Sequence, residues 1–201
     1  MSLFSWDGFV KLITKGEPAA AATGDSEDKG SRVCPATVVV GLGNDLLSDD
    51  GVGLYVARRL RERLAPDRYK VIELSVGGMG LVDHLVGYRR AVVIDACRTG
   101  RRPPGTLSRH RPEDFANSPR LASYHTIDFA TALELARQFG ADLPERMAVF
   151  AIEVEDVETI HEGCTPRVEA RVETAAEQIA RILEAEETQA AEMPSALADA
   201  D

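Results

Sequence analysis

The sequence predicts an α/β fold, a three-layer sandwich in which helices cover both faces of a mostly parallel central sheet. Short β-branched apolar runs at residues 37–42, 91–95 and 147–154 are typical of strands buried on both faces. Amphipathic segments with helical spacing lie between them. Strands that alternate with helices in this way form parallel sheets with helices on both sides.

The expected elements follow from local signals along the chain. Helices are indicated by apolar residues three or four positions apart, and strands by short apolar runs that end at glycine or charge. Thr126 would cap one helix and Gly140 would end it. In order we expect strand 37–42, helix 52–64, strand 70–74, a short helix near 81–88, strand 91–95, an edge strand from 105, helix 126–139, strand 147–154 and a last helix through 172–183.

Composition divides the chain of 201 residues into one domain and two flanking segments. Residues 1–35 end in a stretch rich in glycine, alanine, serine and charge, so we expect a weakly ordered N-terminal extension. Residues 36–185 would form a single α/β domain. Residues 186–201 carry acids and no base, which predicts an acidic disordered tail.

Charge and cysteine content exclude several classes of protein. The net charge of −10 disfavours a nucleic-acid partner, because phosphates require a basic face. The cysteines, Cys34, Cys97 and Cys164, are far apart, so a disulfide framework or a thiolate zinc site is not expected. No apolar run has the length of a membrane span, and the N-terminus does not have the pattern of a signal peptide. We therefore expect a cytoplasmic monomer.

Three residues stand where a parallel sheet normally places its ligand, at the loops beyond the carboxyl ends of the strands. Asp50 follows the first strand, Asp95 ends the third, and His125 precedes a helix. Two carboxylates and one imidazole can contact a divalent metal and leave positions open. Alternatively, Asp95 only starts a turn. For Asp49, which precedes Asp50, the favoured interpretation is that it caps the following helix.

The first loop, from Gly41 to Gly53, does not fit a dinucleotide site. Gly41 and Gly43 have the start of that pattern, but Leu46 occupies the place of its third glycine. The acidic side chains of this loop would also repel a pyrophosphate. A cation is the better ligand for it.

An ordered set of motifs resembles the hydrogenase maturation proteases over residues 36–184. Gly41-x-Gly43-Asn44 precedes the acid pair Asp49-Asp50, and Val93-Ile94-Asp95-Ala96 ends the third strand. Pro104-Gly105-Thr106, His125 and Gly163-x-Thr165-Pro166 follow in order. The resemblance implies an endopeptidase that removes a C-terminal peptide from the large-subunit precursor of a nickel–iron hydrogenase.

The same resemblance implies roles for particular residues. Asp50, Asp95 and His125 would contact nickel that the precursor carries, rather than a tightly bound metal of the enzyme, and the attacking group is unknown. Substrate contacts would fall on Gly43, Asn44, Gly77 and Gly78. Ser75 stands where the family usually has aspartate, so one expected acid is missing.

Two other functions remain open on the sequence. A non-catalytic chaperone on this fold could check nickel with the same three residues. A peptidyl-tRNA hydrolase also begins with a strand and Gly-Leu-Gly-Asn, but Asp45 stands where that family has proline, and an acidic protein binds tRNA poorly.

Overall fold

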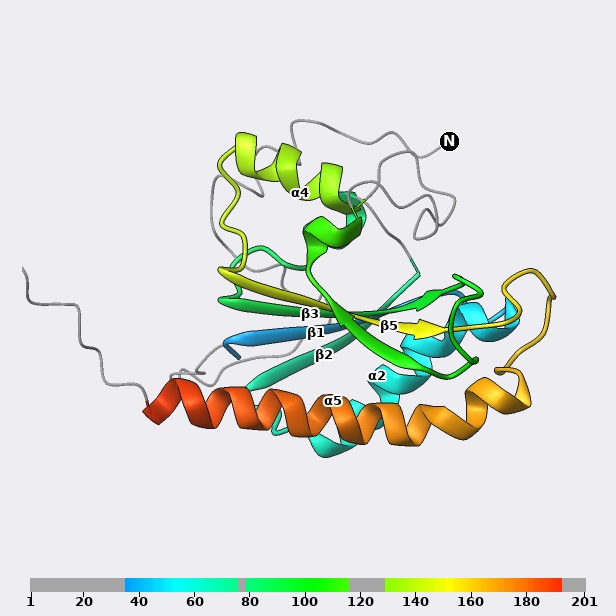
Figure 1. The fold of residues 1–201 in the computed structure, drawn as a ribbon. Helices are drawn as coiled ribbons and strands as arrows, with labels where there is room; N and C mark the ends of the chain where they lie inside the picture. Colours follow the sequence, from blue (N-terminus) through cyan, green and yellow to red (C-terminus); the bar gives the residue numbers. More distant parts are fainter. Residues whose placement is uncertain (1–34, 76–78, 116–128, 193–201) are drawn as a thin grey trace, which may run out of the picture.

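The computed structural model describes residues 35–75, 79–115 and 129–192, and within them a five-stranded sheet lies at the centre (Figure 1). The strand order is β2-β1-β3-β5-β4. β1, β2, β3 and β5 are parallel, and β4 joins the edge antiparallel to β5. This confirms the predicted fold class and the edge strand. The strands are β1 Thr37–Leu42, β2 Tyr69–Leu74, β3 Arg90–Cys97, β4 Leu107–His110 and β5 Arg146–Glu153.

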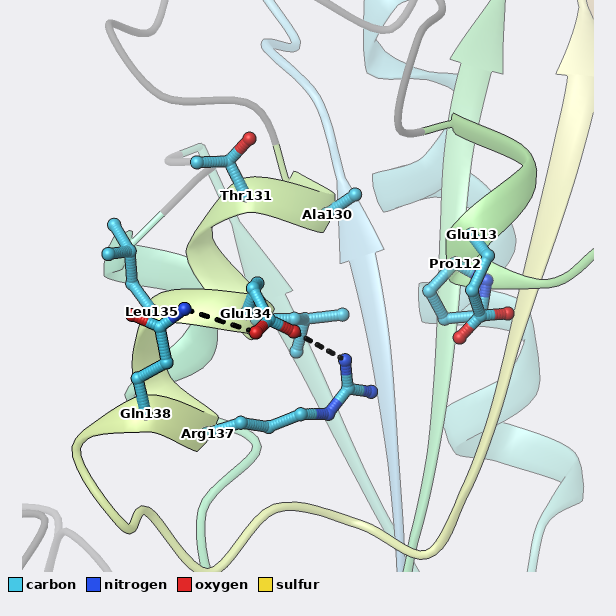
Figure 2. A pocket seen from close by; sticks show the side chains of 9 residues that line it. Pro112, Glu113, Ala130, Thr131, Glu134, Leu135, Arg137 and Gln138 are labelled. Atoms are coloured by element: carbon cyan, nitrogen blue, oxygen red, sulfur yellow. Dashed lines mark hydrogen bonds and ion pairs between the residues drawn. The ribbon is translucent and has the colours of Figure 1, made fainter.

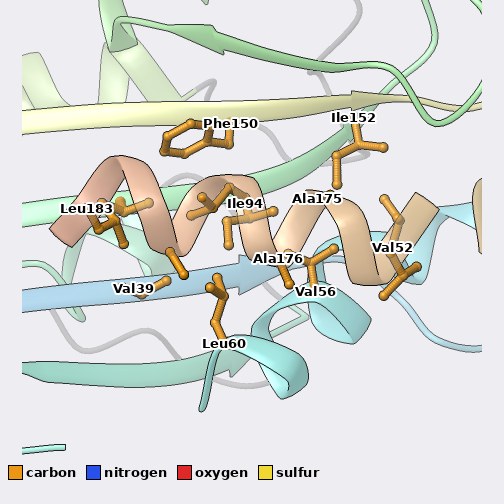
Figure 3. Packing of buried hydrophobic residues seen from close by; sticks show 14 of the residues in the cluster. Val39, Val52, Val56, Leu60, Ile94, Phe150, Ile152, Ala175, Ala176 and Leu183 are labelled. Atoms are coloured by element: carbon orange, nitrogen blue, oxygen red, sulfur yellow. The ribbon is translucent and has the colours of Figure 1, made fainter. Parts of the chain in front are cut away.

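Helices cover both faces of the sheet (Figure 1). Successive side chains of a strand point to opposite faces, so each buried strand supplies two separate cores. Val39, Ile94 and Phe150 pack in the core beneath α2 and α5 (Figure 3). Val38 and Val93 pack on the other face, beneath α3 and α4. The helices are η1 Ser48–Gly51, α2 Val52–Arg63, α3 Met79–Val82, η2 Pro112–Phe115, α4 Phe129–Gln138 and α5 Pro166–Glu192.

Two predicted segments differ most from the structure. α5 continues to Glu192, so the expectation of a disordered tail from residue 186 is wrong for residues 186–192. Glu186 pairs with Arg90 and Arg109, and Glu187 pairs with Arg68, long-range contacts that a composition argument does not detect. The short helix after β2 is Met79–Val82 rather than 81–88. Thr126, the predicted cap of α4, lies outside the described residues.

The end of α5 is tied to the sheet through Glu186. Its carboxylate pairs with Arg90 of β3 and, at 2.6 Å, with Arg109 of β4. The Arg90 side chain is only 14% exposed, so the ion pair between Arg90 and Glu186 is shielded from water more than a surface ion pair.

A membrane-spanning helix requires a long apolar stretch, and no helix within the described residues has one.

We predict that Glu186→Gln lowers the free energy of unfolding by about 1 kcal/mol, because it removes the charge that pairs with two arginines. Glu184→Gln is the matched control, since Glu184 is exposed on the same helix. Urea denaturation of both variants measures the difference. Equal stability of the two variants would contradict an anchoring role for Glu186.

Candidate metal-contacting site at the carboxyl edge of the sheet

The two predicted carboxylates lie at the same edge of the sheet. Asp50 belongs to η1, which follows β1, and Asp95 lies near the carboxyl end of the adjacent β3. η1 packs against β3, so the loop that carries Asp50 lies beside the strand that carries Asp95. The structure therefore brings together two of the three residues predicted to contact a metal.

The backbone after β1 positions the Asp50 carboxylate. The amide of Asn44 donates to Asp50 Oδ2 at 3.0 Å, and the Asn44 side chain accepts a hydrogen bond from the Leu46 amide at 3.1 Å. Gly43 has a φ of 148°, and a Cβ there would lie 2.0 Å from the Asp50 carbonyl oxygen. Gly43 and Asn44 thus have a demonstrable part in shaping the loop, and their predicted contact with substrate stays a prediction.

A second glycine allows η1 and α2 to approach the sheet. A Cβ on Gly53 would lie 2.2 Å from the carbonyl oxygen of Leu42 and 2.5 Å from that of Ile94. Any side chain here would push the start of α2 away from β1 and β3. Since Ile94 precedes Asp95, this close approach brings the loop that carries Asp50 to the second carboxylate.

Burial raises the pKa of both carboxyl groups. Desolvation raises the pKa of Asp95 to about 7, with a smaller contribution from the charge of Asp50, while a hydrogen bond from the Ala96 amide at 2.8 Å acts in the opposite direction. Desolvation also raises the pKa of Asp50, against the hydrogen bond from Asn44. Both shifts favour the protonated carboxyl, and a cation placed beside the pair would favour the charged form instead.

The remaining predicted site residues, His125, Gly77 and Gly78, lie outside the described residues. Within residues 35–75, 79–115 and 129–192, no group of three His, Cys, Asp or Glu side chains could hold a metal ion. Asp50 and Asp95 alone do not form a resident metal site in that part of the chain.

Asp49 does not cap a helix, contrary to the favoured interpretation of the sequence. Its side chain is fully buried, and neither η1 nor α2 receives a side-chain cap. Its carboxylate instead accepts hydrogen bonds from the amides of Glu155 and Asp156, both at 3.1 Å, and from the Thr165 amide at 2.7 Å. Asp49 therefore joins η1 to the loop after β5 and to the start of α5.

We predict that Asp49→Asn lowers the free energy of unfolding by about 3 kcal/mol, because an amide nitrogen cannot accept the hydrogen bonds that one carboxylate oxygen now receives. Asp67→Asn makes the same chemical change at an exposed turn and should have little effect. Thermal or urea unfolding compares the two. A stable Asp49→Asn protein would show that the loop after β5 is held by other contacts.

Sequence reasoning missed a second buried carboxylate, that of Glu153 at the end of β5. Its oxygens accept hydrogen bonds from the Thr99 amide and hydroxyl, both at 2.6 Å, and from the Gly100 amide at 2.7 Å. It also accepts a weak hydrogen bond from Cys97, whose pKa is raised to about 12 by burial and by this carboxylate. An acid that ends an apolar strand was the available signal, the same signal that identified Asp95.

A cavity of about 440 Å³ lies apart from the carboxylate pair, between η2 and α4 (Figure 2). Pro112 and Glu113 line one side, and residues of α4 line the other, including Glu134 and Arg137, which form an ion pair at 3.8 Å. Neither Asp50 nor Asp95 lines it. The cavity is therefore not the metal-contacting site described above.

Comparison with known proteins identifies the class of protein. The sequence profile of the hydrogenase maturation proteases matches residues 54–182. The chain is 30% identical to the hydrogenase 2 maturation protease of Escherichia coli K12 over 144 residues, which cover 71% of this chain and 87% of that protein. It is also 30% identical to the hydrogenase expression/formation protein HoxM of Azotobacter vinelandii over 145 residues, covering 70% of this chain and 69% of that protein.

Solved structures agree with the sequence comparison. The hydrogenase maturating endopeptidase HybD of E. coli superposes with a TM-score of 0.63 and 29% identity, covering 75% of this chain and 93% of that one. A [NiFe] hydrogenase maturation protease of Thermococcus kodakarensis, at 22% identity and a TM-score of 0.58 over 74% and 92% of the two chains, shares the fold.

The chain belongs to the hydrogenase maturation protease family. It is accordingly a hydrolase, an endopeptidase of hydrogenase maturation, as the sequence resemblance predicted. The comparisons give no support to the peptidyl-tRNA hydrolase alternative, and the endopeptidase class replaces the non-catalytic chaperone.

Proposed function

We propose that this protein removes a C-terminal peptide from a hydrogenase large-subunit precursor, and that cleavage requires nickel bound to that precursor. The observation that carries the proposal is the carboxylate pair, Asp50 and Asp95, at the carboxyl edge of the sheet in a member of this protease family. Both carboxylates are available to a cation that arrives with a partner. The reaction would take place in the cytoplasm, with the enzyme acting as a monomer.

The proposed contact with nickel follows from the donor set. Nickel in the precursor would be held mainly by thiolates, which are softer donors than carboxylates. Asp50, Asp95 and His125 would approach the open positions of that ion and would not extract it. His125 enters this set through the family resemblance.

The carboxylates would act by positioning the precursor. Engagement of its nickel would fix the peptide segment that precedes the cleaved bond against the loop of Gly43 and Asn44. A cation beside the scissile carbonyl would polarise it and favour attack by water. A precursor without nickel would offer the two carboxylates no cation to contact, so it would lack this interaction and dock more weakly.

The direct test is to incubate the enzyme with nickel-loaded and metal-free precursor and to follow the precursor mass. We expect loss of a C-terminal peptide from the loaded form alone. Equal cleavage of both forms would overturn the role of nickel, and cleavage of neither would overturn the proposed function.

We predict that Asp95→Asn folds normally but processes the loaded precursor at least about tenfold more slowly, because an amide oxygen is a weaker donor to a divalent cation. Asp142→Asn is the control, since Asp142 is exposed in the segment before β5, at the opposite edge of the sheet. Circular dichroism establishes folding, and the rate of mass loss measures processing. Normal processing by Asp95→Asn would exclude this residue as a metal contact.

A further inference from the structure

The connection between β3 and β4, residues 98–106, is a basic segment in an acidic protein. Five arginines and no acid occur between residues 98 and 111, whereas the whole chain has a net charge of −10. We call residues 98–106 the arginine loop. Its side chains Arg98, Arg101 and Arg102 are exposed.

The arginine loop is held in one conformation by its neighbours. The buried Glu153 carboxylate accepts hydrogen bonds from Thr99 and Gly100 at the start of the loop, as described above. At the other end, the Gly105 amide donates to the Glu153 carbonyl oxygen at 2.7 Å. Gly105 has a φ of 84° and lies against the Arg171 side chain of α5. A loop fixed at both ends presents its cations with little loss of conformational entropy on binding.

Two of its arginine side chains form no ion pair within the described residues. Arg98 pairs with Glu158 at 2.9 Å, and Arg109 beyond the loop pairs with Glu186. Arg101 and Arg102 form no ion pair with any residue of the described ranges. Adjacent exposed arginines without compensating acids create a local positive field on a surface that is otherwise negative on balance.

The loop leaves the sheet at the edge that carries the metal-contacting site. β3 ends at Cys97, two residues after Asp95, and the arginine loop begins with the next residue. The loop after β5 joins the two regions, because Asp156 contacts Asp49 and Glu158 pairs with Arg98. A partner that reaches Asp50 and Asp95 therefore also meets the arginine loop.

We propose that Arg101 and Arg102 bind an acidic segment of the protein substrate, which docks the precursor beside the carboxylate pair. Naming the precursor as the partner rests on the proposed function. The planar guanidinium forms paired hydrogen bonds with a carboxylate, so two adjacent arginines match a segment with two acids. Their field steers that segment toward an enzyme whose net charge would otherwise repel it.

The same features disfavour a nucleic acid as the occupant. Two arginines without an ion pair in the described part of the chain are few for a phosphate backbone, which is normally met by many basic residues. The loop also contains no aromatic side chain on which a base could stack. A protein carboxylate is the ligand that fits both the number and the chemistry of these side chains.

The test is a charge reversal with a matched control. Arg101→Glu/Arg102→Glu changes the charge by the same amount as Arg89→Glu/Arg146→Glu, whose exposed arginines lie at the amino-terminal edge of the sheet. The dissociation constant for nickel-loaded precursor is measured at low and high salt, together with KM for cleavage. Melting temperatures verify that both variants are folded.

We expect the arginine-loop variant to raise the dissociation constant and KM about tenfold at low salt and less at high salt, with the control within about twofold of the wild type. Unchanged binding by the arginine-loop variant, or equal weakening by the control, would overturn the docking site. If the wild type cleaves loaded precursor and the variant keeps the wild-type KM, the docking site alone fails. If the wild type binds precursor without cleaving it, the proposed function fails while the binding comparison still tests the loop.

Discussion

The buried carboxylate of Asp49 is the interaction on which the functional edge of the molecule depends. It accepts hydrogen bonds from backbone amides of the loop after β5 and from Thr165 at the start of α5. These segments are far from Asp49 in the sequence but meet it at the carboxyl edge of the sheet. Since Asp50 is the next residue, the same carboxylate that closes the edge also fixes the backbone that carries a proposed metal contact. Of these two adjacent acids, Asp49 is structural and Asp50 carries the proposed metal contact.

Close backbone packing also shapes this edge of the sheet, and a second buried acid, Glu153, holds another of its loops. Gly43 and Gly53 allow the η1 segment to lie against β1 and β3, at distances no side chain would permit. Glu153 then holds the arginine loop in the way that Asp49 holds the loop after β5. Buried acids thus hold the loops in place, while the partly exposed Asp50 and Asp95 and the exposed arginines carry the proposed contacts with a partner. On this proposal, an acidic protein presents both an anionic and a cationic contact at one edge of its sheet.

Periodicity predicted most of the fold because the strands are buried on both faces and read as apolar runs, as in residues 37–42 and 91–95. The rule that parallel strands place their carboxyl ends together also predicted that Asp50 and Asp95 lie at one edge of the sheet, while their contact with a metal stays a prediction. Sequence patterns gave wrong predictions where contacts between residues far apart in the chain determine the structure. Asp49 was expected to cap a helix because its partners lie more than a hundred residues away, and the end of α5 was expected to be disordered because its ion pairs with Arg90 and Arg109 have no local signature.

The most direct measurement of the central claim, that Asp50 and Asp95 contact nickel borne by the precursor, is X-ray absorption at the nickel edge. Spectra would be recorded for loaded precursor alone and in complex with the wild-type enzyme, trapped before cleavage at low temperature. We expect oxygen or nitrogen neighbours to add to the sulfur ligands in the complex, and fewer of them with Asp95→Asn. A nickel environment that is identical in the free and bound precursor would contradict the claim.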